Sequence, residues 1–389
     1  MCRNEEFVMQ LIYNTSELRN LCARLSNYDF LAVDLEFIRE KTYYPLLCLI
    51  QVASKDEAAI IDPLAPDMDL SPFFELMQNN KIVKVFHSCR QDVEILYQLS
   101  GKVPQPLFDT QIAAMVCGFG ESIGYERLVK AVLNIELDKT DCLSNWQLRP
   151  LNEHQLEYAC GDVTHLINVY EYLKQQLEEK GRVDWIKEEV DVASSEKTYV
   201  TDPLEAWERI KFRSHNSKVL SNLRDLAAWR EKRAQDKNVP RQSIIKDDVL
   251  TMIATANPQS REDLEKIRGM RKDVANGKLA DEMLEVLSNV KVDNKISKQK
   301  KNDTYNSIPS LVEMFKMLLK IVSQEEGVVA RIIATDTDLQ KLGAYKDKDC
   351  AVLSGWRKEI FGKKALKLRD GALSIHYNPK TKNIEFLEK

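Results

Sequence analysis

The chain has little of what zinc sites, disulfide frameworks and membrane spans require. Its eight cysteines are scattered singly, with no Cys-x₂-Cys pair, so neither a zinc site nor a disulfide framework is predicted. No hydrophobic run approaches the roughly 18 residues that a membrane-spanning helix needs. The first residues lack the basic and then apolar pattern of a signal peptide. Together these absences predict a protein of the reducing cytoplasm, with no membrane partner.

The charge of the chain is divided unevenly between its two halves. Residues 1–200 contain 19 Lys and Arg against 32 Asp and Glu. Residues 201–389 contain 37 Lys and Arg against 28 Asp and Glu, and the two halves together give the net charge of −4. A basic part beside an acidic one is typical of nucleic-acid binding, although a modest basic excess is also compatible with an ordinary soluble surface. The length of 389 residues predicts two or three domains.

Two acidic residues, Asp34 and Glu36, interrupt an apolar run at residues 30–37. The run predicts a buried β-strand, and residues two apart on a strand share one face. Two carboxylates side by side in an apolar setting repel each other, and a cation relieves that repulsion. Ligands that are all oxygen favour Mg²⁺ or Mn²⁺. The alternative is a strand end at which both carboxylates reach water.

Further candidate residues follow on two predicted helices. Asp92 lies in the first turns of an amphipathic helix that follows an apolar strand. Tyr158 and Asp162 are four residues apart on a later helix, so they share one face. Singly, Asp92 would be a solvated helix residue and Tyr158 a packing residue. Together, these residues resemble the three motifs of the tyrosine subclass of the DEDD exonuclease superfamily. In chain order, those motifs are Asp-x-Glu on a strand, Asp on a helix and Tyr-x₃-Asp on a second helix.

Longer blocks narrow this resemblance to one family. Residues 33–51, which contain Thr-Tyr-Tyr-Pro and end at Gln51, resemble the first motif block of ribonuclease D. Residues 108–114 and 141–151 are similar to blocks that the family carries between its second and third motifs. His87 stands five residues before the second-motif acid, where ribonuclease D-like sequences also have His. The resemblance covers nearly the whole chain.

Residues 1–195 predict an α/β domain, and the resemblance implies a ribonuclease H-like 3′–5′ exonuclease domain. Apolar runs predict strands at residues 30–37, 46–53, 58–62 and 82–87, and helical periodicity predicts helices at about 89–99, 108–117, 122–134 and 152–179. Short turns between the first three strands favour an antiparallel meander. The charged segment 178–203 is expected to be a connector.

The rest of the chain predicts two all-α domains. Residues 204–290 resemble an HRDC domain, the small helical module shared by RecQ-type helicases and ribonuclease D. A lysine-rich linker is expected at 291–307, and residues 308–389 resemble a second, divergent HRDC-like domain. Within this last domain we expect a helix at 311–320 and a short strand-like tail at 372–377.

Two tryptophans, Trp229 and Trp356, stand beside basic residues. This pairing suits base stacking combined with phosphate contacts. We favour core positions for both, because tryptophan is usually largely buried.

The resemblance implies hydrolysis of RNA 3′ ends to nucleoside 5′-monophosphates. Two divalent ions, Mg²⁺ or Mn²⁺, would be held by the four acids Asp34, Glu36, Asp92 and Asp162, with Asp34 shared between them. Tyr158 would orient the attacking water. The implied partner is RNA, with trimming of tRNA precursor 3′ ends as the expected task, and no obligate protein partner is indicated. Deletion of residues 204–389 is expected to weaken RNA binding more than the chemical step.

Four residues are expected to contact the substrate, namely the backbone of Leu35 and the side chains of His87, Gln51 and Tyr43. For His87 we favour a structural role, as a donor that braces the second-motif acid. Tyr43 is equally compatible with packing on the sheet. Asp109 is expected to cap a helix and not to join the acids.

Two other functions remain open. Related folds include DNA 3′–5′ exonucleases, which competition between matched RNA and DNA strands would distinguish. An inactive tRNA-binding scaffold is the non-enzymatic alternative. All four acids and the tyrosine are present, so the sequence does not favour the scaffold.

Overall fold

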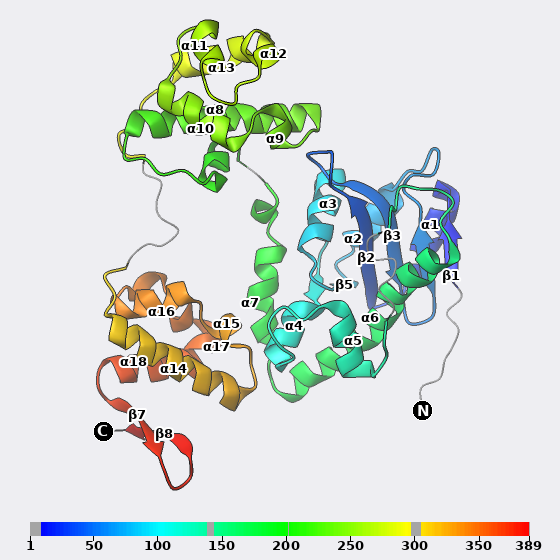
Figure 1. The fold of residues 1–389 in the computed structure, drawn as a ribbon. Coiled ribbons are helices and arrows are strands. Elements are labelled where there is room, and N and C mark those ends of the chain that lie inside the picture. The colour runs from blue at the N-terminus through cyan, green and yellow to red at the C-terminus, as the bar shows by residue number, and fades with distance from the viewer. Residues whose placement is uncertain (1–8, 138–143, 201, 297–304, 389) are drawn as a thin grey trace.

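A computed structural model describes residues 9–137, 144–200, 202–296 and 305–388. Figure 1 shows a sheet-containing body in blue to green, a helical body in green to yellow, and an orange to red body that ends in a hairpin. Part of the expected motif block 141–151 and part of the expected linker 291–307 lie outside the described residues. Within the described ranges, no helix is long and apolar enough to cross a membrane.

A six-stranded mixed sheet forms the centre of the first domain. Its strand order is β1 (Met9–Ile12), β4 (Ala58–Ile61), β3 (Leu46–Ala53), β2 (Phe30–Ile38), β5 (Val83–Phe86) and β6 (Leu107–Asp109). The pairs β2–β3 and β3–β4 are antiparallel, which confirms the predicted meander, and β2–β5 is parallel. The edge strands β1 and β6 were not among the predicted strands.

Helices cover both faces of this sheet. On one face, α1 (Thr15–Leu25), α2 (Ser71–Met77) and α3 (Arg90–Ser100) pack in a core that includes Leu35 and, at its margin, Phe37. On the other face lies α6 (Glu153–Glu179), through Val163 and Leu166. Because β2 alternates faces, the intervening Asp34 and Glu36 point to the α6 side.

The predicted helices of the first domain are confirmed within a few residues. They correspond to α3, α4 (Thr110–Cys117), α5 (Tyr125–Leu133) and α6. Asp109 caps α4 as expected, accepting a hydrogen bond from the Gln111 backbone N–H at 2.8 Å. The same carboxylate accepts from the backbone N–H groups of Ser88 and Cys89, at 3.0 and 2.9 Å. It therefore also fixes the turn that leads into α3.

The connector expected at 178–203 is instead largely helical. It contains α7 (Val183–Ala193) and the short helix η1 (Glu196–Thr198). Trp185 of α7 stacks on Trp356 of the last domain, with ring centroids 4.4 Å apart and planes 6° apart. The guanidinium of Arg182 lies 4.6 Å from the Trp185 ring, and that of Arg357 lies 4.5 Å from the Trp356 ring. The stack confirms the prediction that Trp356 occupies a core position. It also joins the first and last domains.

The middle domain is all-helical, as predicted. Its elements are η2 (Pro203–Arg209), α8 (Ser217–Lys237), α9 (Arg241–Ile244), α10 (Asp247–Ala256), α11 (Arg261–Glu265), α12 (Lys272–Ala275) and α13 (Lys278–Asn289). Leu223, Leu250 and Met283 belong to its core. Trp229 is half-buried against this core and donates to Glu282 at 3.0 Å, so it too has a structural position.

The last domain is not all-α, which corrects the prediction. Its helical elements are α14 (Pro309–Glu326), α15 (Ala330–Ile333), α16 (Asp336–Gly343), η3 (Asp347–Asp349), η4 (Ala351–Leu353), α17 (Gly355–Arg357), η5 (Lys358–Gly362) and α18 (Lys363–Arg369). The expected helix at 311–320 lies within α14. The chain then forms an antiparallel hairpin of β7 (Leu373–Asn378) and β8 (Asn383–Glu388). Only the first of these strands was expected, because the second is interrupted by acidic residues.

The first and last domains share one hydrophobic core. Phe315, Leu318 and Phe361 of the last domain belong to the same buried cluster as Val116 of α4 and Leu128 of α5. The Val329 backbone N–H also donates to the Met115 carbonyl at 3.2 Å. The last domain therefore belongs to the same structural unit as the first domain.

A matched pair of glycine substitutions tests this shared core. Gly118 and Gly101 both end helices with left-handed backbones, at φ +91° and +71°. A methyl group at Gly118 would overlap the Gly327 carbonyl of the last domain, whereas none of the described atoms lies near one at Gly101. We expect Gly101→Ala to cost about 1 kcal/mol of unfolding free energy and Gly118→Ala about 3 kcal/mol or more. Equal losses in denaturant unfolding would contradict this domain contact.

Candidate active site

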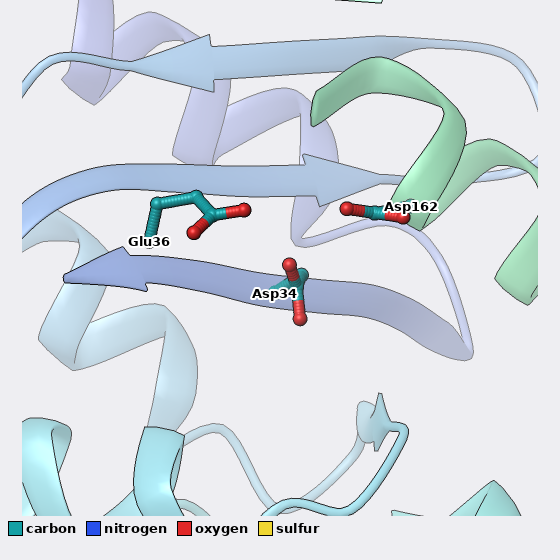
Figure 2. A group of neighbouring side chains, drawn as sticks. All are labelled: Asp34, Glu36 and Asp162. Atoms are coloured by element: carbon teal, nitrogen blue, oxygen red, sulfur yellow. The ribbon is translucent and has the colours of Figure 1, made fainter. Parts of the chain in front are cut away.

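Three of the four predicted acids come together on the α6 side of the sheet. One carboxylate oxygen from each of Asp34, Glu36 and Asp162 lies within 4.8 Å of the other two. Figure 2 shows the three side chains gathered beside β2 and α6. Asp34 and Glu36 share a face of β2, and Asp162 reaches them from α6. All three side chains are half-buried, so a small ligand can reach them. Local strand periodicity and one helix packed on the strand are enough to assemble this cluster.

The fourth acid, Asp92, lies beside this cluster but is not one of the three. It occupies the first turn of α3 and is buried. Burial raises the pKa of Asp92 well above its ordinary range, and the charges of Asp34 and Asp109 raise it further. The Asp34 carboxylate thus acts electrostatically on Asp92, and Asp109 fixes the turn in front of Asp92.

All three acids of the cluster have raised pKa values. Burial raises the pKa of Asp34 to about 7. Burial, followed by the charges of Asp34, Asp162 and Asp92, raises the pKa of Glu36 to about 9. Burial and the charge of Asp34 raise the pKa of Asp162 to about 8. Within the described chain, no Lys or Arg lowers any of these three pKa values. A set of oxygen ligands with unbalanced charge fits hard divalent cations.

Tyr158 is held at the edge of the cluster. It lies one helical turn before Asp162, and its hydroxyl forms a hydrogen bond with that carboxylate, which opposes the rise in the Asp162 pKa. Its ring packs 6.0 Å from the ring of Trp146, which is buried. The phenol is therefore fixed by the same residue that ends the Tyr-x₃-Asp motif.

Gln51 lies directly opposite Asp34 on the neighbouring strand β3. Its side chain is fully buried, and neither its amide oxygen nor its nitrogen has a hydrogen-bond partner among the described residues. An unpaired buried amide is costly, at about 1–3 kcal/mol. Gln51 therefore places an unsatisfied amide directly beside the acid cluster.

The Leu35 side chain points to the opposite face of the sheet from Asp34 and Glu36. Its side chain is buried in the core on the α1–α3 side. A hydrogen bond from its backbone lowers the pKa of Asp34, against the larger effect of burial. Among the described residues, β2 pairs with β5 only from Phe30 to Ala32, so this pairing does not extend to Leu35.

His87 does not brace Asp92, which corrects that prediction. Its Nδ1 lies 3.0 Å from the Thr110 hydroxyl, and its Nε2 lies 3.0 Å from the Ile123 carbonyl. Both ring nitrogens are thus engaged. The role that the structure shows is to join the end of β5 to the start of α4 and to the loop before α5.

Tyr43 lies in a contact between domains and not in the acid cluster. Its hydroxyl hydrogen-bonds to Glu231 and to Gln235 of α8, the latter at 3.2 Å. These contacts show Tyr43 packed against the middle domain and not on the sheet, which was the alternative to the predicted substrate contact. Nothing local in the sequence could reveal a contact across 188 residues.

Tyr125 is a site residue that sequence reasoning missed. Its hydroxyl donates to the carbonyl of Gly161, at 3.1 Å, immediately before Asp162. Burial raises the Tyr125 pKa strongly, and the charges of Asp162 and Asp34 add to this effect. Its ring lies 5.5 Å from that of His87. A single tyrosine at a helix start carries no motif, so only the fold places it here.

Removal of this hydroxyl should loosen the third motif. We expect Tyr125→Phe to lower the free energy of unfolding by about 1 kcal/mol and to weaken metal affinity, because the Asp162 backbone loses its support. Tyr172→Phe, on the more exposed part of α6, is the control and should change neither quantity. Metal titration by calorimetry checks this, and unchanged affinity in Tyr125→Phe would exclude the positioning role.

Known protein families match both parts of this description. A model of the 3′–5′ exonuclease family matches residues 9–178, and a model of the HRDC domain matches residues 220–287. The fold and the acidic cluster thus define a 3′–5′ exonuclease with an appended HRDC domain.

Full-length relatives make the assignment specific. Ribonuclease D of Nitrobacter hamburgensis is 43% identical over 369 residues, which cover 94% of this chain and 97% of that protein. Ribonuclease D of Bartonella henselae is 42% identical over 95% of this chain and 92% of its own length. The crystal structure of Escherichia coli RNase D superposes with a TM-score of 0.78 at 28% identity, covering 93% of this chain and 99% of that one. The chain belongs to the ribonuclease D family, and it is an enzyme, a 3′–5′ exoribonuclease.

Proposed function

We propose that this enzyme removes nucleoside 5′-monophosphates one at a time from RNA 3′ ends, with two divalent metal ions held by Asp34, Glu36, Asp92 and Asp162. The observation that carries the proposal is the trio of carboxylates within 4.8 Å, without a basic partner among the described residues. When bound, two such ions supply an activated water and relieve charge on the phosphoryl and leaving oxygens. Either Mg²⁺ or Mn²⁺ fits this ligand set.

Asp34 is our choice for the ligand shared by both ions. It is the residue whose charge raises the pKa of Glu36, Asp92 and Asp162 alike. A carboxylate that interacts with the three others lies centrally among them. This central position supports the bridging role.

Tyr158 orients the attacking water in this proposal. Its hydroxyl is already fixed by Asp162, so it presents its remaining hydrogen-bonding capacity in one direction. Because a phenol ordinarily ionises near pH 10, orientation suits it better than proton abstraction. Its substitution by phenylalanine would remove this hydrogen bond and keep the ring.

Gln51 and the Leu35 backbone are the proposed contacts to the terminal nucleotide. The buried amide of Gln51 can bond the ribose or the phosphate of a nucleotide bound beside Asp34. Leu35 lies between Asp34 and Glu36 and beyond the described pairing of β2 with β5, which supports a contact through its backbone. His87 and Tyr43, in contrast, are assigned structural roles by their hydrogen bonds.

RNA is the proposed partner, and trimming of tRNA precursors the proposed task, in the cytoplasm and with no obligate protein partner. The E. coli relative is described as an exoribonuclease involved in structured RNA processing. The basic excess of residues 201–389 supports binding to a polyanion.

The substrate class is tested by competition between matched strands. We expect a tRNA precursor with a 3′ extension to be shortened to its mature end, and an unlabelled RNA strand to compete better than the DNA strand of equal sequence. Preferential hydrolysis of the DNA strand would instead establish a DNA exonuclease. Binding without hydrolysis would establish the scaffold.

A further inference from the structure

An arginine-lined cavity lies between the first and middle domains. Its volume is about 350 Å³, and its walls come from the segment after β2 and from the middle domain. The basic residues that line it are Arg39, Arg209, Arg230 and Arg241, against two acids, Glu40 and Asp247. The lining therefore carries a net positive charge and favours an anion.

Hydrogen bonds across the domain contact hold the cavity walls in place. The side-chain oxygen of Asn238 accepts from the backbone N–H groups of Tyr43 and Tyr44, at 3.1 and 3.0 Å. The Tyr43 hydroxyl also bonds to Glu231, which is fully buried. The segment after β2 is thus anchored to α8, and the cavity is a built feature of this contact.

The four arginines of the cavity differ in how far their guanidinium groups are already paired. Arg230 is only 3% exposed, donates to the Ile245 carbonyl at 2.8 Å and pairs with Asp247 at 2.7 Å, but its Nε has no acceptor within the described chain. Arg241 pairs with Glu231 at 3.1 Å and lies over the Tyr43 ring. Arg209 is exposed, and no ion pair of its guanidinium occurs in the described ranges. Arg209 therefore offers N–H groups to a bound anion, and the paired guanidinium of Arg230 adds positive charge to the wall.

The cavity is linked to two of the three elements that bear the acids, β2 and α3. Arg39 follows Glu36 by three residues, so their Cα atoms are at most about 11 Å apart. Its guanidinium pairs at 2.8 Å with Glu94, which is two residues after Asp92 on α3. A strand with its 3′ end at the acids would thus have its upstream phosphates within reach of this wall.

We propose that this cavity is a phosphate-binding subsite for the RNA backbone upstream of the terminal nucleotide. The inference rests on the proposed function, since it assigns a path to the same substrate. A phosphodiester carries one negative charge and accepts paired N–H groups from a guanidinium. A volume of about 350 Å³ suits a phosphate with its sugar and excludes a folded partner.

The test compares Arg209→Gln with Arg268→Gln in the full chain. Both residues are exposed arginines of the middle domain, and Arg268 does not line the cavity. With EDTA present to prevent hydrolysis, we expect Arg209→Gln to weaken binding of a single-stranded RNA oligonucleotide about five- to tenfold. The slope of log Kd against log salt should fall by about 0.7. Arg268→Gln should match the wild type in both quantities.

Substrate length supplies a second readout. Turnover of the oligonucleotide by Arg209→Gln should fall by a similar factor, whereas turnover of a dinucleotide, which is too short to reach the cavity, should be unchanged. Thermal unfolding should not change, because the Arg209 side chain is exposed. Equal behaviour of the two variants, or an equal defect on the dinucleotide, would overturn the subsite.

The possible outcomes distinguish a failure of the phosphate subsite from a failure of the proposed exoribonuclease function. A wild-type enzyme that neither binds nor degrades RNA would contradict the proposed function itself. An active wild type with an unaffected Arg209→Gln variant would contradict the subsite alone. If inorganic phosphate raised the melting temperature of the wild type but not of Arg209→Gln, while RNA affinity stayed equal in both, the cavity would take free phosphate and the RNA assignment would be wrong.

Discussion

Replacement of Asp34 by asparagine is expected to lower the rate of RNA hydrolysis at least a thousandfold while the fold is retained. The shared metal ligand supplies several kcal/mol of transition-state stabilisation, and each 1.4 kcal/mol is about a factor of ten. The same change removes the charge that raises the pKa of Glu36, Asp92 and Asp162. The metal-free variant should therefore be at least as stable as the wild type at neutral pH.

Single-turnover kinetics and thermal unfolding measure the two parts of this prediction. Asp191→Asn, an exposed position on α7, is a matched control and should leave both quantities unchanged. Hydrolysis by Asp34→Asn at the wild-type rate would exclude the metal assignment. A clear loss of stability in metal-free Asp34→Asn would mean that the carboxylate has a structural partner.

The metal-free enzyme is expected to lose stability as the pH rises from about 5 to about 9, and divalent metal should abolish that loss. The pKa values of Asp34, Asp162 and Glu36 in the folded chain are about 7, 8 and 9, above their ordinary values of 3.8, 3.8 and 4.5. Between the ordinary and the raised values, the folded state holds more protons than the unfolded state. Stability is therefore fully present below about pH 4 and falls as the pH rises through the raised values, by an amount on the order of several kcal/mol.

Melting temperatures across this pH range, in EDTA and in Mg²⁺ or Mn²⁺, test the second prediction. Metal displaces the protons, so its stabilising effect should grow with pH. Asp34→Asn should flatten the pH dependence in EDTA. A metal-free melting temperature that stays level or rises through this window would show that the acids are not held in a mutually repelling cluster.

The sequence was sufficient to predict the acid cluster because local rules assemble it. The two-residue period of β2 brings Asp34 beside Glu36, and the four-residue spacing brings Tyr158 beside Asp162. Only the packing of α6 on the sheet is non-local. Tyr125 and the engagement of both His87 nitrogens depend on the loop before α5, whose course no local pattern predicts.

The contacts between domains could not be predicted either, because they join residues that are far apart in the sequence. The sequence of α7 was interpreted as a connector because charged residues are frequent in it. Its apolar residues Trp185 and Ile186 pack on the shared core, and that contact is seen only in the structure. The anchoring of Tyr43 to α8 is equally long-range. Deletion of residues 204–389, a test that the sequence favours, would uncover the apolar side chains of α4 and α5. Point variants such as Arg209→Gln therefore test RNA binding more cleanly than truncation.

The most direct test of the account is a time course on a 5′-labelled single-stranded RNA with the wild-type enzyme. With Mg²⁺ or Mn²⁺, we predict a ladder that shortens one nucleotide at a time from the 3′ end, with release of nucleoside 5′-monophosphates. EDTA should stop the reaction, and Asp34→Asn should show no ladder. Internal cleavage, release of 3′-monophosphates, or an undiminished ladder in EDTA would contradict metal-dependent 3′–5′ hydrolysis at this cluster.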